Sequence, residues 1–496
     1  MAALGYVCLS DLHLGATDSV LTNIDASGHV AKAPGAVLTN FAAAMRKTIP
    51  PLSGDHLPVL VLMGDAIDLG LSSNGEVSTG FLHFVDAFFP AGKKPIFSDQ
   101  VICIPGNHDH HLWRMSQDEQ YLLDIEAGGA DSIGADLTNC TPLLGVPSYP
   151  CRLLTSLMRT RKHLASACVN IAYPNLGLTN SSGDRAVVLH HGHYIDSMYR
   201  SLSRFRAWMT GNDKPPGTVA DLEAQNGPWI DFLWSDLGSA GMIGRGAETL
   251  YEIMLDAGAS HDLAESLAQK IMTDLGTSFG LRGDTVLPLA GHGITTMELL
   301  RGLISLTAGR TAESQRDGYR SVLSKEEVAD LRWYLAGPVA NQFRAERGAK
   351  REALPQKLSF IFGHTHKPFQ DQLAFHPYAQ PVSIYNTGGW VMDQPTRMSC
   401  QGAAAVLIDT ELNTASLRLF NDTVNGQVRP VNAQGVGGYL DIENPLFAAL
   451  QEAIAKSGTS WTKFSDAVSH AIARQAKVRL NEFMPAALHA KQGART

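Results

Sequence analysis

Aspartate, histidine and asparagine side chains gather in five short segments, each directly after a run of apolar residues. Carboxylate, imidazole and amide oxygen are ligands that Mn, Fe, Zn or Co ions accept, and no cysteine lies among these polar residues. Two metals that share a carboxylate can activate water and clamp the oxygens of an in-line displacement at phosphorus. The sequence therefore predicts a two-metal site for phosphoester chemistry, built from Asp11 and His13, Asp65 and Asp68, Asn107, His108 and Asp109, His190, His191 and His193, and His364 and His366.

The apolar runs before these segments have the composition of buried β-strands. "YVCL", "PVLVLM", "VICI", "AVVL" and "LSFIF" are short and rich in Val, Ile or Phe, which fits strands covered on both faces. Between the first runs, "AVLTNFAAAMRKTI" and "TGFLHFVDAFF" have helical spacing, so we expect an α/β fold. Ligands in such folds gather beyond the carboxyl ends of the strands, and the five segments are therefore expected to form one site.

The spacing of apolar residues divides the chain into parts. Residues 1–193 and 357–443 carry the strand-like runs and are predicted to form the catalytic core. Residues 194–356 show mainly helical spacing and are predicted to be an insertion that could cover the site as a cap. Residues 444–496 are expected to form a C-terminal helical extension.

Composition limits the classes of partner. The 496 residues are 44% hydrophobic, which is enough for a sizeable core, and the formal net charge of −8 argues against a duplex nucleic acid substrate. The six cysteines lack paired spacing, so we expect free thiols. The first residues lack the basic start of a signal peptide and no apolar stretch has membrane-spanning length, so we expect a soluble cytoplasmic protein. The oligomeric state is left open.

In their order along the chain, the segments resemble the motifs of the calcineurin-like metallophosphoesterase superfamily. The matching patterns are Asp11-x-His13, Gly64-Asp65-x-x-Asp68, Gly106-Asn107-His108-Asp109, a histidine after an apolar strand, and Gly363-His364-x-His366. The resemblance implies an α/β fold with a four-layer α-β-β-α sandwich, here carrying a large helical insertion. It also implies two divalent metal ions, among which Mn is favoured over Fe, Zn or Co.

The resemblance assigns a role to each ligand by its place in the motifs. Asp11, His13 and His366 would hold the first metal, Asp65 would bridge, and Asn107, His191 and His364 would hold the second. His191 is favoured in the fourth segment because the family's ligand directly precedes glycine. By strand alternation His190 would point to the opposite side. His193, Arg200 and Arg204 are candidates for contact with the substrate.

The resemblance also implies the chemistry. His108 would be the catalytic histidine that protonates the leaving oxygen or stabilises charge on the phosphoryl group, and Asp68 would orient it. A metal-bridging hydroxide would attack phosphorus. The expected activity is therefore metal-dependent hydrolysis of a phosphate ester, with a diester or pyrophosphate favoured.

Departures from the subfamily patterns leave several alternatives open. Protein serine/threonine phosphatases of the superfamily carry arginines where this chain has Leu69 and Pro105, which argues against that activity. The UDP-diacylglucosamine hydrolases share "SDLHLG" but have arginine in place of His108, and DNA-repair nucleases share "SDxHLG" and "GNHD". A lipid-nucleotide pyrophosphatase and a nuclease therefore remain as enzyme alternatives. A catalytically weak binding or scaffold module is the alternative from another class.

Overall fold

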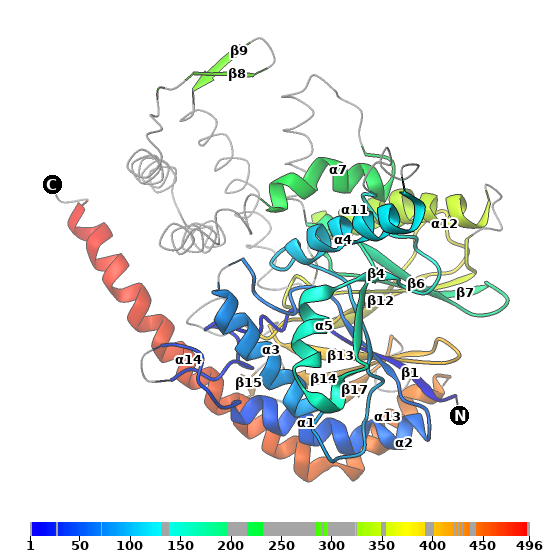
Figure 1. The fold of residues 1–496 in the computed structure, drawn as a ribbon. Coiled ribbons are helices and arrows are strands. Elements are labelled where there is room, and N and C mark those ends of the chain that lie inside the picture. Colours follow the sequence, from blue (N-terminus) through cyan, green and yellow to red (C-terminus); the bar gives the residue numbers. More distant parts are fainter. Residues whose placement is uncertain are drawn as a thin grey trace.

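Two large β-sheets and several helices make up the described part of this computed structural model, which is a mixed α/β fold (Figure 1). No helix among the described residues is long and apolar enough to cross a membrane. The structure describes residues 2–25, 28–70, 72–129, 138–196, 216–231, 284, 286–289, 292–295, 323, 325–348, 354–391, 401–420, 423–424, 427–428, 430–436 and 443–493.

The first sheet has eight strands, and its centre is parallel. β1 pairs with β2, β2 with β3 and β3 with β5 in parallel, whereas the outer pairs are antiparallel. Polar residues that follow β1, β2 and β3 therefore lie at the same edge. In spatial order the strands are β17 (Asn432–Gln434), β14 (Thr414–Phe420), β13 (Ala403–Asp409), β1 (Leu4–Leu9), β2 (Val59–Leu62), β3 (Gln100–Cys103), β5 (Cys168–Ile171) and β4 (Tyr149–Pro150).

The second sheet has five strands with a parallel centre of its own. β10 pairs in parallel with both β7 and β12, and the edge strands are antiparallel. The carboxyl ends of β7 and β10, which precede the fourth and fifth polar segments, therefore lie side by side. The strand order is β11 (Phe369–Leu373), β12 (Val382–Asn386), β10 (Lys357–Phe362), β7 (Arg185–His190) and β6 (Asn175–Thr179).

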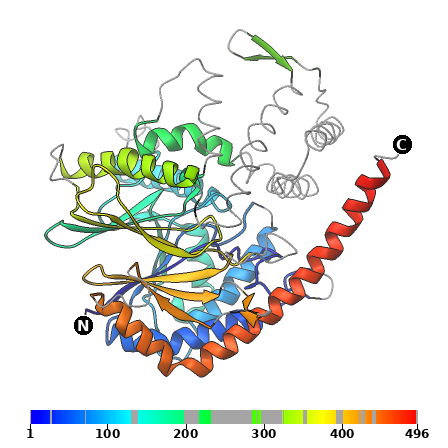
Figure 2. The same cartoon turned by 180° about the vertical axis from the view of Figure 1, so that it is seen from behind.

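Helices connect and cover these strands (Figures 1 and 2). In the first 196 residues the helices are α1 (Ala36–Thr48), α2 (Pro50–Ser53), α3 (Asn74–Phe88), α4 (His111–Gly128), α5 (Arg152–Arg159), η2 (Lys162–Leu164) and η3 (His193–Ile195). Later in the described chain they are α7 (Val219–Ile230), α11 (Lys325–Tyr334), the π-helix η5 (Leu335–Val339), α12 (Ala340–Arg347), α13 (Pro445–Lys456) and α14 (Gly458–Gly493). The remaining strands form two hairpins, β8 (Val286–Leu289) with β9 (His292–Thr295) and β15 (Thr423–Val424) with β16 (Gln427–Val428).

Alternation along the strands separates the buried residues into three clusters. Val7 of β1 packs with α1 and α3, whereas the next residue, Cys8, packs with residues of the second sheet. Likewise Val187 of β7 faces the first sheet, and Val188 faces the other way. The period of two puts one cluster between the sheets and one on the outer face of each.

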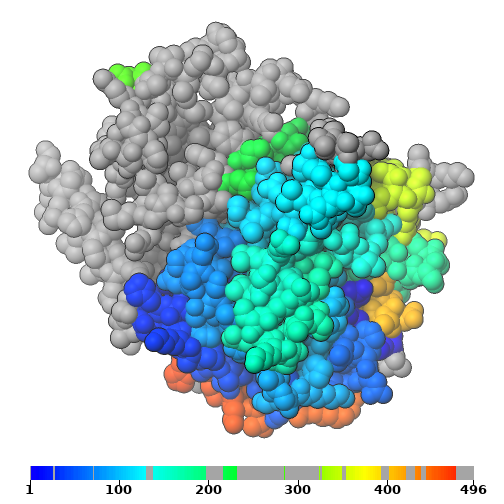
Figure 3. All heavy atoms as spheres, in the orientation of Figure 1, coloured from blue at the N-terminus to red at the C-terminus, as the bar shows by residue number. Residues whose placement is uncertain are grey.

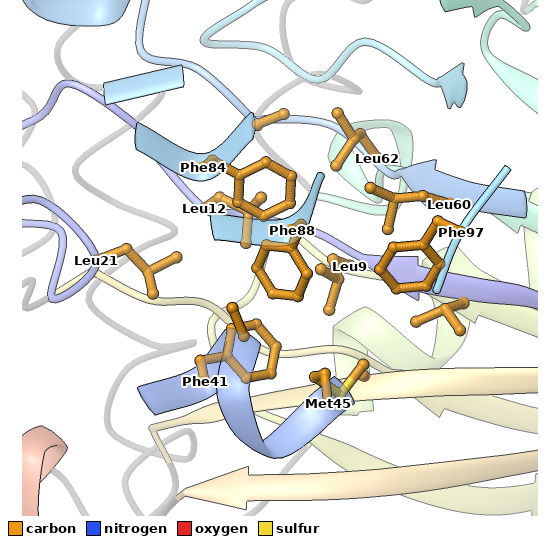
Figure 4. Packing of buried hydrophobic residues seen from close by; sticks show 14 of the residues in the cluster. Leu9, Leu12, Leu21, Phe41, Met45, Leu60, Leu62, Phe84, Phe88 and Phe97 are labelled. Atoms are coloured by element: carbon orange, nitrogen blue, oxygen red, sulfur yellow. The ribbon is translucent and has the colours of Figure 1, made fainter. Parts of the chain in front are cut away.

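The cluster on the outer face of the first sheet is rich in aromatic residues (Figure 4). Phe41 of α1 and Phe88 of α3 meet with ring centroids 5.3 Å apart, and Leu9 of β1 lies beside Phe88 in the close view. The C-terminal helices belong to the same cluster, because Phe464 of α14 lies 5.6 Å from Phe41 and Leu450 of α13 is fully buried. Residues 444–493 are thus mainly helical, and their part up to Ile472 packs on the first sheet's outer cluster.

The described parts of the 194–356 segment are more varied than the helical spacing predicts. β8 and β9, which includes His292, form an antiparallel hairpin where the segment is predicted to be mainly helical. Helices α11 and α12 contribute Tyr334 and Phe343 to the cluster on the outer face of the second sheet, together with Phe360 of β10. This end of the segment therefore covers the second sheet.

Candidate active site

All five polar segments meet where the carboxyl ends of the two parallel centres face each other. The amide of His13 donates to the carbonyl of Asp65 at 2.8 Å, which joins the first two segments. The amide of Gly363 donates to the carbonyl of His191 at 2.6 Å, which joins the fourth and fifth. The amide of His364 donates to Asp11 Oδ1 at 3.0 Å and so connects the two sheets.

Three groups of side chains in this region could each hold a metal ion; two of them match the assigned ligands, and the third, His13, Asp68 and His108, shares His13 with the first. Asp11, His13 and His366 form the first group, and Asp65, His191 and His364 form the second, each with its ligand atoms within 4.8 Å of one another. In the first group His366 Nε2 lies 3.4 Å from Asp11 Oδ1. The structure thus brings together the residues assigned to each metal.

Asp65 lies between the two groups. Its Oδ2 is 3.2 Å from His191 Nε2 and 3.7 Å from His13 Nε2, so one carboxylate oxygen faces a histidine of each group. Asn107 also belongs to the second group, because its Oδ1 lies 3.1 Å from His191 Nε2. Burial alone would raise the pKa of Asp65, but the surrounding histidines hold that pKa well below its usual range. The carboxylate is therefore ionised.

One carboxylate orients two histidines of the site. Asp68 Oδ2 lies 3.1 Å from His13 Nδ1, and Asp68 Oδ1 lies 3.3 Å from His108 Nδ1. Burial would raise the pKa of Asp68, but His108 and His13 lower it well below its usual range, so the carboxylate accepts from both rings. The sequence resemblance assigns Asp68 to His108, and the contact with His13 is an additional finding.

The contact with Asp68 also fixes which atom of His13 faces the site. Because Nδ1 donates to Asp68, a neutral His13 ring has its lone pair on Nε2. This Nε2 atom is buried and has no hydrogen-bond partner among the described residues. A buried imidazole nitrogen 3.7 Å from Asp65 Oδ2 fits a divalent metal ion, and the carboxylate behind its other nitrogen is the usual support of such a ligand.

His191 has the same arrangement. Its Nδ1 lies 3.1 Å from the carbonyl oxygen of Met63, to which it must donate, so Nε2 faces Asp65 and Asn107. Both histidines therefore turn Nε2, the nitrogen that would bind a metal, toward the site.

The backbone at five of the seven candidate ligands lies in the left-handed region. Positive φ values occur at Asp11 (51°), His13 (43°), Asp65 (49°), His364 (68°) and His366 (54°), and Leu412 is the remaining non-glycine case in the described residues. Each such residue costs about 1–2 kcal/mol relative to the right-handed conformation. Strain of this kind persists only where the surrounding structure enforces it, and it concentrates at functional sites.

Glycines of the motifs make room for the site's side chains. A Cβ atom on Gly363 would overlap Asp11 Oδ2 and Ser10 Oγ, and one on Gly106 would overlap Asp65 Oδ1. The two loops approach these carboxylates more closely than any other residue type allows.

Replacing Gly363 by alanine is expected to damage both stability and activity. The new methyl group must push Asp11 and Ser10 aside, which costs about 1–3 kcal/mol by the usual scale of overpacking. Thermal unfolding should therefore occur at a lower temperature in Gly363→Ala, and phosphoester hydrolysis should fall with it. Gly458→Ala is the matched control, because nothing lies within 4 Å of a Cβ there. Equal unfolding temperatures for the two variants would contradict the close approach at Gly363.

The three histidines of the fourth segment have separate surroundings. His191 contacts Asp65, and His190 lies on the opposite side against Tyr334 and Phe360. His193 is fully buried, with its ring 4.2 Å from that of Tyr194. Its contact with substrate stays a prediction. The other two substrate candidates, Arg200 and Arg204, lie outside the described residues.

Several residues that support the site are not predicted from the sequence. Ser10 donates to Asp11, and Thr387 contacts Ser10 from the end of β12. The Asn386 side chain donates to the carbonyl of Gly363 at 3.0 Å, and Asp196 Oδ2 lies 3.2 Å from His364 Nε2. Asn386 and Thr387 follow an apolar strand run, "PVSIY", as the five segments do, and this pattern is the signal that could have revealed them.

The loop after His108 contains His110, whose pKa is changed strongly by two ion pairs. His110 is buried, with Nε2 3.0 Å from Glu223 Oε1 and Nδ1 2.6 Å from Asp231 Oδ1. Burial alone would lower the pKa of His110, but the two carboxylates raise it from 6.5 to about 9. Arg114, Tyr173 and Tyr194 also belong to this cluster, and both tyrosines stay protonated because burial raises their pKa well above the usual range.

Stability is expected to depend on pH through His110. Because the pKa is raised in the folded state, the stabilisation is fully present below pH 6.5 and is lost as pH rises through about 9. In EDTA, the unfolding temperature of the wild type should fall more steeply across this range than that of His110→Asn. Parallel curves for the two proteins would show that the ion pair does not form.

Comparison with known families agrees with this geometry. The sequence model of the family described as calcineurin-like phosphoesterase matches residues 6–286, which is more than half of the chain. The chain therefore belongs to the calcineurin-like phosphoesterase family. No relative was found among the curated proteins. The matched region contains the first four polar segments, and the fifth, with His364 and His366, joins them in the fold.

Proposed function

We propose that this protein is a metal-dependent phosphoesterase that hydrolyses a phosphodiester or pyrophosphate bond. The single observation that carries the proposal is Asp65, which lies between two groups of histidine and aspartate ligands. Family membership supports phosphoester hydrolysis as the reaction class. Two divalent ions, with Mn favoured, would supply Lewis acidity and an activated water when bound.

The proposed roles of the ligands follow from the two groups. Asp11, His13 and His366 would hold one ion, Asp65 would contact both, and Asn107, His191 and His364 would hold the other. The buried Nε2 of His13, without a hydrogen-bond partner among the described residues, supports this assignment on grounds independent of the motifs.

His108 is proposed to donate a proton to the oxygen of the leaving group. Its Nδ1 is held by Asp68, so Nε2 is the ring atom that can carry a proton to the leaving oxygen. The amide of His108 donates to Asp65 Oδ1 at 2.8 Å, which ties its position to the centre of the site. Asp68 would keep the ring oriented and stabilise its protonated form.

A diester or pyrophosphate is favoured over a monoester because of charge. A terminal phosphate monoester brings two negative charges, which phosphatases commonly neutralise with arginine. Leu69 and Pro105 occupy the two places where the family's protein phosphatases carry arginine, and both are apolar. A singly charged phosphodiester needs less compensation.

The test is hydrolysis of bis(p-nitrophenyl) phosphate and p-nitrophenyl phosphate with added Mn²⁺, compared with the same assays in EDTA. The proposal expects metal-dependent turnover of the diester that exceeds turnover of the monoester. Faster monoester turnover would refute the substrate class, and silence with both substrates in a metal-loaded protein would refute the enzyme assignment and favour a binding role.

A further inference from the structure

Helix α7 of the insertion reaches the loop that carries His108. Glu223 of α7 is 2% exposed, and its carboxylate accepts hydrogen bonds from His110 Nε2 at 3.0 Å and the Tyr173 hydroxyl at 2.8 Å. The Tyr194 hydroxyl donates to it as well. In the space-filling view α7, in green, lies against α4, in cyan, which begins directly after His110 (Figure 3). The insertion therefore contacts the core at the third and fourth polar segments.

The His110 ring is held on both sides by carboxylates. Its Nε2 faces Glu223, and its Nδ1 lies 2.6 Å from Asp231 Oδ1 at the end of α7. The other oxygen of Asp231 lies 3.2 Å from Arg114 Nε, which keeps that carboxylate in place. Because ionised carboxylates only accept, both ring nitrogens of His110 must donate, and the buried ring has one orientation.

His110, held by Glu223 and Asp231, lies close to His108, the residue proposed to donate the proton. His110 follows His108 by two positions, and Asp109 between them accepts from the amides of Gly106 at 2.6 Å and Ala66 at 2.9 Å. The loop is thus fixed by Asp109 on the side of the first sheet and by His110 on the side of the insertion. His108 directly precedes these two attachments in the chain, and its ring contacts Asp68.

We infer that Glu223 is a positioning residue for phosphoester hydrolysis, acting through His110 on the placement of His108. The inference rests on the proposed function. The inference makes the insertion a contributor to catalysis, because the position of the His108 loop depends on a residue 115 positions later in the chain (223 − 108 = 115). If Glu223 only held α7 against the core, its replacement would change stability and leave the reaction rate of the folded protein unchanged.

The test compares Glu223→Gln with a matched control, Glu346→Gln. Glu346 of α12 also ties the insertion to the core, by accepting from the amides of Leu143 at 2.6 Å and Leu144 at 2.8 Å, but it does not touch the His108 loop. Both proteins are assayed with Mn²⁺, below their unfolding temperatures. Glu223→Gln is expected to lower kcat by about 10- to 100-fold at nearly constant KM. Glu346→Gln is expected to keep the wild-type kcat.

The dependence of the rate on the leaving group distinguishes a positioning role of Glu223 from a purely structural role. A misplaced proton donor slows a poor leaving group more than a good one. Glu223→Gln should therefore lose more activity on diphenyl phosphate than on bis(p-nitrophenyl) phosphate. In a His110→Asn background it should lose nothing further, because the path through His110 is already broken. Equal losses on the two substrates, or additive losses in the double variant, would overturn the inference. Asp231→Asn serves if Glu223→Gln does not fold, with the same expected result.

A separate readout keeps the inference distinct from the proposed function. If the wild type shows no Mn²⁺-dependent turnover, the proposed function fails, and the positions of the histidines are compared by NMR of ¹⁵N-histidine-labelled protein. Glu223→Gln should then shift the ring signals of both His110 and His108, whereas Glu346→Gln should shift neither. An unchanged His108 signal in Glu223→Gln would overturn the coupling between α7 and the loop.

Discussion

Asp65→Asn is expected to abolish hydrolysis of bis(p-nitrophenyl) phosphate and to lower the amount of metal that the protein binds. Asp65 faces a histidine of each ligand group, so its loss affects both proposed ions at once. We expect turnover to fall by at least about 10³-fold, which corresponds to about 4 kcal/mol of transition-state stabilisation. Metal content measured after dialysis should fall in the same variant.

Asparagine is the informative replacement because it changes the charge and little else. Asn and Asp both tolerate the left-handed backbone found at Asp65, and an asparagine oxygen can still accept from the amide of His108. Asp86→Asn is the matched control, because it removes the charge of a surface carboxylate that forms an ion pair with Arg161. An Asp65→Asn protein with unchanged metal content and turnover would rule out the bridging role.

His108→Gln is expected to lose activity while it keeps its metal. His108 contacts Asp68 and belongs to neither of the two proposed ligand groups, so its replacement leaves those groups intact. A lost general acid typically costs about 10²- to 10⁴-fold in rate. The measurement is kcat with Mn²⁺ together with metal content, and the larger loss should occur with the poorer leaving group.

A histidine remote from the site provides the comparison. His83 lies on α3 and its Nε2 contacts the carbonyl of Lys32, so His83→Gln should keep wild-type turnover. If His108→Gln turned over bis(p-nitrophenyl) phosphate as fast as His83→Gln, His108 would have no part in the chemistry.

Part of the candidate site could be predicted because it depends on local sequence. Each polar segment follows a short apolar run, and parallel pairing brings the first three segments to one edge of the first sheet and the last two to one edge of the second. Asp11 and His366 belong to different sheets and are expected together from the order of the family's motifs; the structure places them 3.4 Å apart although 355 positions separate them (366 − 11 = 355). The mixed α/β class follows from the same alternation of strands and helices.

The supporting contacts could not be predicted because they depend on tertiary structure. Asp68 contacts His13 through a second oxygen, and no spacing in the sequence indicates that pairing. Glu223 and Asp231 meet His110 only because α7 packs beside α4, and a buried glutamate within a helical pattern has no distinguishing local signal. The hairpin of β8 and β9 was missed because helical spacing dominates the segment around it.

The most direct test of the two-metal site is electron paramagnetic resonance during titration of chelator-treated protein with Mn²⁺, with diester hydrolysis followed in the same samples. Two ions that share the Asp65 carboxylate should give the spectrum of an exchange-coupled pair at about two equivalents, and activity should rise with that signal. Only the spectrum of isolated Mn²⁺, or full activity at one equivalent, would contradict the proposed site.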